Sequence, residues 1–174
     1  MPVTKSRRAR HLVAPVAALA LASALSVATA TPASAAEDFT FDLPAGQACA
    51  TFDLRAEGTG DQRITREFTD QNGDVVRVLQ AGIGYDLTFT NLSSGETLVL
   101  PSNGTVTRTT INADGSTTIQ TTGHNVLILF PTDVPAGPST TLYAGRVVFT
   151  VATNGVFTVL STSGRTTDIC AVLA

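Results

Sequence analysis

Residue types that build many catalytic and binding sites are scarce in this 174-residue sequence. It contains no tryptophan, two tyrosines, two cysteines and two histidines. Because exposed aromatic rings are the usual platforms for sugars, this scarcity argues against a sugar site of the stacking type. Zinc requires three or four protein ligands, and His124 is the only histidine beyond residue 35. We therefore predict no metal-binding, cofactor-binding or catalytic residues.

The first 35 residues have the layout of a secretory signal peptide. A basic segment at residues 5–10 precedes an apolar run at residues 12–30, and Ala33-Ser34-Ala35 fits the small-residue rule of a cleavage site. About 20 apolar residues can also span a bilayer, but this run ends in threonine, proline and serine without a charge cluster. We predict cleavage between Ala35 and Ala36 and a soluble, secreted product without a membrane anchor. Both general and twin-arginine export stay open.

Removal of this leader leaves a strongly acidic chain. The leader holds four of the eleven Lys and Arg residues and none of the fourteen Asp and Glu residues. Residues 36–174 therefore carry seven arginines, no lysine and a net charge of −7. Such a chain lacks the basic surface that nucleic acids and anionic membranes require. We expect neither nucleic acid nor a membrane as a partner and favour an extracellular protein or a cell-wall component. We expect the protein itself to be a monomer.

The two cysteines, Cys49 and Cys170, lie near opposite ends of the predicted mature chain. Thiols outside the cell are usually oxidised, and two cysteines allow one intramolecular pairing. A metal site would need more ligands, and a catalytic thiol would need a histidine partner. We predict a structural Cys49–Cys170 disulfide that ties both terminal segments to the domain.

The hydrophobic pattern beyond the leader is that of β-strands almost throughout. Apolar residues alternate with polar ones at residues 39–43, 50–56 and 85–89, whereas residues 126–130 and 147–151 are more continuously apolar. The first pattern indicates strands with one buried face, and the second indicates central strands covered on both sides. The terminal residues 169–173 also fit a strand. No segment has a convincing helical period.

About ten short strands separated by Asn-Gly and Asp-Gly turns predict one domain over residues 36–174. So many strands in one sheet would leave an apolar face wet, so we predict two packed antiparallel sheets. The predicted fold class is an all-β, antiparallel sandwich of the Greek-key or immunoglobulin-like type, with a barrel as the alternative.

One turn has the spacing of a calcium loop. Asp70, Asn72 and Asp74 match its first three ligands, but the glycine and the glutamate expected later in such a loop are absent. We predict a hairpin turn, with a weak calcium site as the alternative.

The longest irregular connection covers residues 131–139 and contains three prolines. Prolines stiffen a loop and remove hydrogen-bond donors. We predict a rigid connection that carries the chain from one sheet to the other. Long loops on rigid β-scaffolds often hold function, so this loop is also a candidate binding or protease-inhibiting segment.

His124 lies between Gly123 and Asn125 at the entry of an apolar run. A serine–histidine–aspartate site would need this histidine, yet no serine lies in a G-x-S-x-G motif. We predict a histidine at a strand end, bonded to backbone, rather than a general base.

Carboxylates offer a second route to catalysis. A general acid–base pair requires two carboxylates that converge in a cleft with separated pKa values. The candidates on or near predicted strands are Asp53, Glu57, Asp61, Glu67 and Asp86.

Residues 105–122 are rich in threonine. Rows of threonine can bind ordered surfaces such as carbohydrate or ice. Threonine also favours exposed strands, and we expect Arg108, Asn112 and Gln120 to interrupt both faces of the hairpin. We predict an exposed hairpin.

Five segments of the C-terminal half form a recognisable set: Thr88-Phe89-Thr90-Asn91-Leu92, the Asp114-Gly115 turn, Leu127-Ile128-Leu129-Phe130-Pro131, Gly145-Arg146-Val147-Val148-Phe149 and the stretch from Gly164 to Cys170. Together they resemble segments of small secreted β-domain proteins of high-GC Gram-positive bacteria, the actinobacteria. The resemblance implies a secreted β-domain and assigns no catalytic or binding residue.

The leading functional hypothesis is a secreted, non-enzymatic binding or structural module of the extracellular space or cell envelope. The alternatives are a hydrolase with paired carboxylates and a protease inhibitor that presents residues 131–139.

Overall fold

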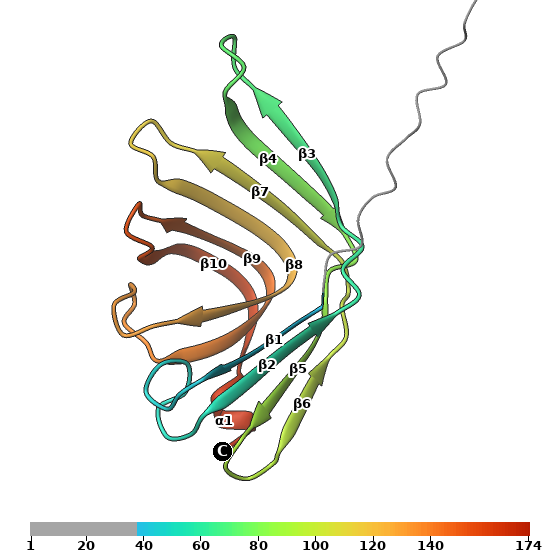
Figure 1. The fold of residues 1–174 in the computed structure, drawn as a ribbon, viewed down its shortest axis with the longest axis vertical. Coiled ribbons are helices and arrows are strands. Elements are labelled where there is room, and N and C mark those ends of the chain that lie inside the picture. The colour runs from blue at the N-terminus through green and yellow to red at the C-terminus, as the bar shows by residue number, and fades with distance from the viewer. Residues whose placement is uncertain (1–37) are drawn as a thin grey trace, which may run out of the picture. The chain divides into compact units, whose positions relative to one another are not determined.

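The computed structural model describes residues 38–174, which form two antiparallel β-sheets packed against each other (Figure 1). This arrangement confirms the predicted all-β sandwich, and the two sheets do not close into a barrel. The predicted leader and its cleavage site at Ala35 and Ala36 lie outside the described residues.

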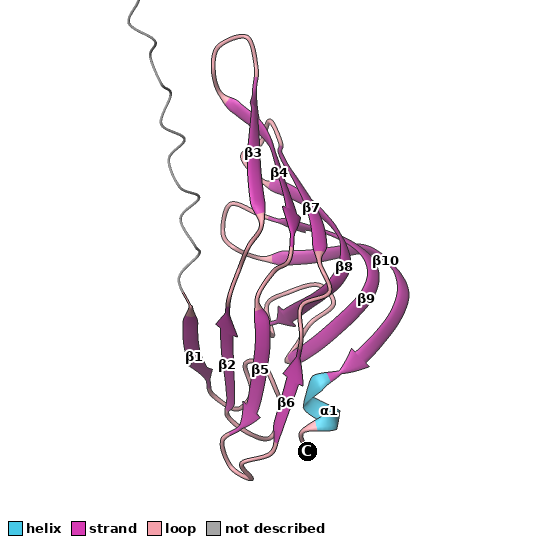
Figure 2. Cartoon of the chain, turned by 90° about the vertical axis from the view of Figure 1, so that its right-hand side faces the viewer, coloured by secondary structure: helices cyan, strands magenta, loops and turns pink. Residues whose placement is uncertain are grey.

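Sheet A has four strands and sheet B has six. The order in sheet A is β1 (Phe39–Leu43), β2 (Leu54–Thr59), β5 (Asp86–Asn91) and β6 (Thr97–Leu100). The order in sheet B is β10 (Phe157–Asp168), β9 (Ser139–Val151), β8 (Thr117–Leu129), β7 (Thr105–Ile111), β4 (Val75–Gly82) and β3 (Ile64–Thr69). Figure 2 shows sheet A at the lower left and the curved strands β8, β9 and β10 beside it.

The two continuously apolar segments belong to β8 and β9, in the middle of sheet B, as predicted. Both faces of β8 are covered near its end. Val126 and Ile128 pack against the core around Leu54 of sheet A, whereas Leu127 packs with Val147 in a second core inside sheet B. Cover on both faces explains why this segment lacks the alternation of a half-exposed strand.

Two sequence-based strand assignments are wrong. Residues 50–53 lie in an irregular segment before β2, although Phe52 is buried there. Residues 169–173 do not form a strand, because α1 (Ile169–Val172) is a short helix. Asp168 caps this helix by accepting a hydrogen bond from the Ala171 amide at 3.0 Å. Ile169 and Leu173, four residues apart, face the core together.

No helix among the described residues is long and apolar enough to cross a membrane.

Strands β8, β9 and β10 are strongly curved (Figure 1), and three glycines lie opposite one another near the middle of these strands. Gly123 of β8 pairs with Gly145 of β9, which pairs with Gly164 of β10. A Cβ atom built on Gly145 or Gly164 would lie 2.1 or 2.3 Å from a backbone oxygen of the neighbouring strand, and one built on Gly123 would lie 2.4 Å from the carbonyl oxygen of Gly104, just before β7. Only residues without a side chain permit so close an approach. The glycine row therefore allows sheet B to fold over itself.

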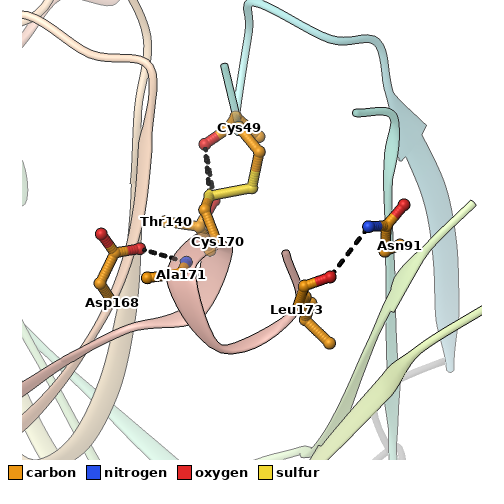
Figure 3. The surroundings of a disulfide bond; sticks show 8 residues. Cys49, Asn91, Thr140, Asp168, Cys170, Ala171 and Leu173 are labelled. Atoms are coloured by element: carbon orange, nitrogen blue, oxygen red, sulfur yellow. Dashed lines mark hydrogen bonds between the residues drawn. A yellow bond between two sulfur atoms is a disulfide. The ribbon is translucent and has the colours of Figure 1, made fainter. Parts of the chain in front are cut away.

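The predicted Cys49–Cys170 disulfide is present, with a Cα–Cα distance of 5.5 Å (Figure 3). It joins α1 to the irregular segment before β2. Two hydrogen bonds reinforce this attachment. The buried Thr140 hydroxyl donates to the Ala48 carbonyl at 3.1 Å, and the Asn91 amide donates to the Leu173 carbonyl at 2.9 Å. Asn91 of β5 thus holds the C-terminal segment directly, whereas Thr140 of β9 holds the irregular segment to which Cys170 is bridged.

Removal of the disulfide should weaken the fold strongly. The bridged residues are 121 positions apart, and in the chain-entropy model such a loop contributes about 4–5 kcal/mol. We expect the Cys49→Ala/Cys170→Ala variant to lose free energy of unfolding of that order in urea titrations. Reduction of the unaltered protein serves as the control and should produce a similar loss. Equal stability of the oxidised protein and the variant would contradict this account.

The close backbone contacts at the glycine row predict that a side chain there destabilises the fold. Gly145→Ala places a methyl group against the Ser163 carbonyl, so β9 and β10 must separate. The matched control is Gly46→Ala, which also has a positive φ but opens into free space. The control should cost about 1–2 kcal/mol through its backbone conformation alone. Gly145→Ala should cost about 1–3 kcal/mol more in the same urea assay because of overpacking, and equal losses would count against a steric role for the glycine row.

Candidate ligand-binding cavity between the sheets

Three connections pass from one sheet to the other and meet at one end of sheet A (Figure 2). They are residues 60–63 between β2 and β3, 83–85 between β4 and β5, and 101–104 between β6 and β7. The Gln62 amide donates to the Ile83 carbonyl at 2.9 Å, which joins the first two connections. The Ser102 amide donates to Asp86 at 2.7 Å, which holds the third connection against β5. These hydrogen bonds connect residues 60–63, 83–85 and 101–104 at the junction of the sheets, and we call these three connections the rim.

A cavity of about 240 Å³ lies behind this rim. Residues of the three connections line its entrance, including Arg63, Tyr85 and Ser102. Side chains of both sheets form its largely apolar walls, contributed by Leu87, Leu100, Ile119, Leu127, Leu142 and Phe149. The cavity is therefore a product of both sheets and of the connections between them.

A chain of polar side chains crosses the apolar wall of this cavity. The hydroxyls of Thr107 and Thr121 lie 2.9 Å apart, and Thr121 donates to the Asn125 side-chain oxygen at 2.6 Å. In a straight strand, residues four positions apart would be separated by about 13 Å. Thr121 and Asn125 meet because β8 bends at Gly123 between them.

The Asn125 Nδ2 group is buried without a hydrogen-bond partner, the only such side-chain atom among the described residues. A buried amide N–H without an acceptor costs about 1–3 kcal/mol. Asn125 lines the cavity. An acceptor atom placed inside the cavity would satisfy this donor, so the wall is chemically suited to a ligand that carries an oxygen or nitrogen acceptor.

An ion pair and two aromatic rings stabilise the rim. Arg63 Nε donates to Asp61 at 2.8 Å, and the Asp61 side chain is only 7% exposed. The Arg63 guanidinium carbon lies 5.6 Å from the centre of the Tyr85 ring, a cation–π distance. The Tyr85 ring meets Phe39 edge to face at 5.0 Å. Hydrogen bonds from Arg63 lower the pKa of Asp61 below its ordinary value, so this carboxylate stays ionised.

His124 lies at the mouth of the cavity, but its partner differs from the predicted one. Instead of bonding to backbone at a strand end, it lies within β8 and contacts the Asn103 side chain, with Asn103 Nδ2 2.9 Å from His124 Nδ1. An amide nitrogen can only donate, so Nδ1 accepts in this arrangement. His124 is exposed and lines the cavity beside Asn125.

The acidic residues considered for a hydrolase do not gather at the cavity. No aspartate or glutamate of residues 38–174 lines it. Asp53 accepts from the Ala45 amide and Asp86 from the Ser102 amide, while Asp61 pairs with Arg63. Glu57 and Glu67 lie on strands of different sheets. The structure therefore does not bring a pair of carboxylates together in this cleft.

The proline-rich connection at residues 131–138 does not carry the chain between sheets, contrary to the sequence-based expectation. It joins β8 to β9, which are neighbours in sheet B. Asp133 is buried and accepts from the Phe130 and Phe157 amides at 2.6 and 2.8 Å. The Val134 amide donates to the Phe157 carbonyl at 2.8 Å. The start of this loop is therefore docked on β10.

The predicted hairpins at residues 70–74 and 105–122 are present as the β3–β4 and β7–β8 pairs. Asp70 accepts from the amides of Asn72 and Asp74 at 2.8 and 3.0 Å and so closes its own turn. The structure corrects the expectation that polar residues interrupt both faces of the threonine-rich hairpin. Arg108 and Gln120 lie opposite each other and interrupt only one face. The other face contributes Thr107 and Thr121 to the cavity wall.

Comparisons of the chain with protein-family models, with curated proteins and with solved structures returned no match. The assignment of a site therefore depends on geometry alone.

Sequence reasoning did not find the residues that define this cavity. Arg63, Tyr85, Leu100 and Phe149 come from distant parts of the chain, and nothing in their local sequence connects them. One signal was available. Asn125 directly precedes an apolar run, and a polar amide at the edge of a buried strand segment requires a partner.

The Asp61–Arg63 pair predicts a pH dependence of stability. Because the pKa of Asp61 is lower in the folded chain, its ionised form stabilises the fold above the unfolded pKa of about 3.9. This contribution disappears as the pH falls through the lowered, folded-state pKa. In urea titrations between about pH 5 and about pH 2, the Asp61→Asn variant should lose less stability than the unaltered protein.

The matched control for this prediction is Asp42→Asn. Asp42 pairs with Arg55 and also has a lowered pKa, but both side chains are well exposed. Water screens this second pair, so its removal should change the pH dependence less. An equal or larger effect at Asp42 would contradict the special role given to the rim pair.

Proposed function

We propose that the protein is a secreted, soluble, non-enzymatic binding protein that holds a small ligand in the cavity between its sheets. The observation that carries the proposal is the unpaired Asn125 Nδ2 donor in the wall of a 240 Å³ cavity. An apolar pocket with a few convergent polar groups is the usual form of a small-molecule site.

The dimensions and chemistry of the cavity restrict the ligand. Sites for drug-sized molecules measure about 300–1,000 Å³, so this cavity suits a smaller molecule. Its walls favour an apolar body, such as a single ring or a short branched chain. The Asn125 donor favours a carbonyl, ether or hydroxyl oxygen on that body. We therefore favour a compact ketone, lactone, amide or alcohol.

Export is supported by the chain's N-terminal sequence and by its covalent chemistry. The leader has the layout of a signal peptide. A disulfide that ties both ends of the domain is typical of proteins in oxidising compartments. These features, together with the resemblance to secreted actinobacterial β-domains, support a binding function outside the cell.

The test uses a panel of compact carbonyl compounds that includes the matched pair acetophenone and ethylbenzene. We expect acetophenone to perturb the amide resonances of Leu127 and Phe149 in NMR spectra, and ethylbenzene to bind more weakly because it lacks an acceptor. Leu100→Trp, which fills the cavity, should abolish binding. The control Val99→Trp changes an exposed neighbour on the same strand and should retain it. Absence of binding across the panel would refute the proposal.

Asn125→Leu separates the role of the donor from that of cavity shape. This variant removes the unpaired buried donor and also the acceptor of the Thr121 hydroxyl. Because Thr121 can donate to Thr107 instead, thermal stability should stay constant or rise. Its affinity for acetophenone should fall toward that for ethylbenzene. Retained discrimination between the two compounds would show that Asn125 does not contact the ligand.

A further inference from the structure

Four of the seven arginines beyond the leader gather in neighbouring rows on one face of sheet B, and Arg165 of β10 follows on the same face. Residues directly opposite each other in antiparallel strands project to the same face. The register of β3, β4, β7, β8 and β9 therefore defines three neighbouring rows on this face. They are Phe68–Arg77–Thr110–Thr118–Thr150, Arg66–Leu79–Arg108–Gln120–Val148 and Ile64–Ala81–Val106–Thr122–Arg146. We call these fifteen residues the arginine face.

The arginine face contains four cations and no carboxylate. Its arginines are exposed, and none forms a salt bridge within the described residues. Arg146 donates to the neutral Gln120 side chain at 3.0 Å. By contrast, Arg55 and Arg63 are each paired with an aspartate. Four unpaired cations on one face of a strongly acidic chain leave positive charge available for an external anion.

We propose that the arginine face binds an extended acidic polysaccharide through its carboxylates. Arginine presents a planar fork of donors that matches a carboxylate with two parallel hydrogen bonds. Arg66 and Arg108 lie on the same row with one strand between them, a separation of about 10 Å. This interval is close to the length of one disaccharide unit. Arg146 continues the series two strands further on.

The rest of the face also suits a sugar polymer. Threonine hydroxyls and the Gln120 amide lie between the arginines and can bond to sugar hydroxyls. Ile64, Phe68 and Val106 are 69%, 45% and 48% exposed and offer apolar contacts to the C–H faces of sugar rings. The shortage of aromatic residues argues against stacking-type sugar sites, but carboxylate recognition by arginine does not require stacking.

The geometry favours a linear polymer over a membrane. A broad anionic surface would also approach the acidic residues elsewhere on a chain with a net charge of −7, and these would be repelled. A single polymer chain can follow the three rows and avoid them. A shallow depression lined by Val106, Thr122 and the glycines Gly82, Gly104 and Gly123 borders the third row and gives space for a ring at that end.

The experiment measures retention of the full mature protein on immobilised polygalacturonate, with dextran as the neutral control. We expect binding to polygalacturonate that weakens between about 50 and about 200 mM salt, as for other polyanions. Arg66→Gln/Arg108→Gln should lower the affinity by roughly tenfold or more. The control Arg55→Gln removes a positive charge away from the face, in sheet A, and should leave the affinity within about twofold. Circular dichroism and thermal melting of both variants verify their fold.

Three outcomes would overturn the inference. The first is passage of the unaltered protein through the polygalacturonate column at low salt, and the second is an equal loss of affinity in the Arg66→Gln/Arg108→Gln variant and the Arg55→Gln control. Binding confined to polyphosphate or to vesicles with anionic lipid would assign the face to a different anion. Selective loss of polygalacturonate binding in the Arg66/Arg108 variant supports the inference. The cavity variant Leu100→Trp should still bind the polymer, which separates this face from the proposed small-molecule site.

Discussion

The bend of sheet B at its glycine row is the constraint on which the rest of the structure depends. Six strands in a flat sheet would leave one apolar surface without cover, and sheet A has only four strands to offer. Close contact of Gly123, Gly145 and Gly164 with neighbouring backbone lets the long strands turn in their middle. One half of these strands then packs on sheet A, while the other half builds a second core around Val147 and Phe149.

The same bend explains why a cavity exists and why it is polar at one point. Thr121 and Asn125 meet only because β8 turns between them; their hydrogen bond occupies the Asn125 Oδ1 atom, while the Nδ2 atom has no partner. Natural cores rarely retain an unpaired donor, because it costs stability without compensation. Ligand binding offers a physical reason for this exception. The rim is held independently by Asp61, Arg63 and Tyr85, so the entrance does not depend on the polar wall.

The two faces of sheet B have different chemistry. One contributes threonine and apolar side chains to the space between the sheets, and the other presents four unpaired arginines to solvent. The register of the antiparallel strands produces this separation. Successive side chains of a strand point to opposite faces of the sheet, and paired residues of neighbouring strands point to the same face. If both proposals hold, a polymer bound to the arginine face would leave the cavity on the other face of sheet B open. The disulfide and α1 hold the opposite end of the sandwich, away from the arginine rows.

The sequence by itself determined the β class, the number of strands, the main turns and the Cys49–Cys170 pairing. These follow from period-two patterning, from turn residues and from the fact that two cysteines permit one bridge. It did not reveal that residues 169–172 form a helix, because a segment of four residues is too short to show a helical period. Only the tertiary structure decided which residues share a face or a cavity. The arginines are scattered along the sequence, and the register of five neighbouring strands places four of them in adjacent rows on one face. Asn125 and Thr121 become neighbours through a bend that depends on backbone contacts between strands, and such contacts leave no local pattern in the chain.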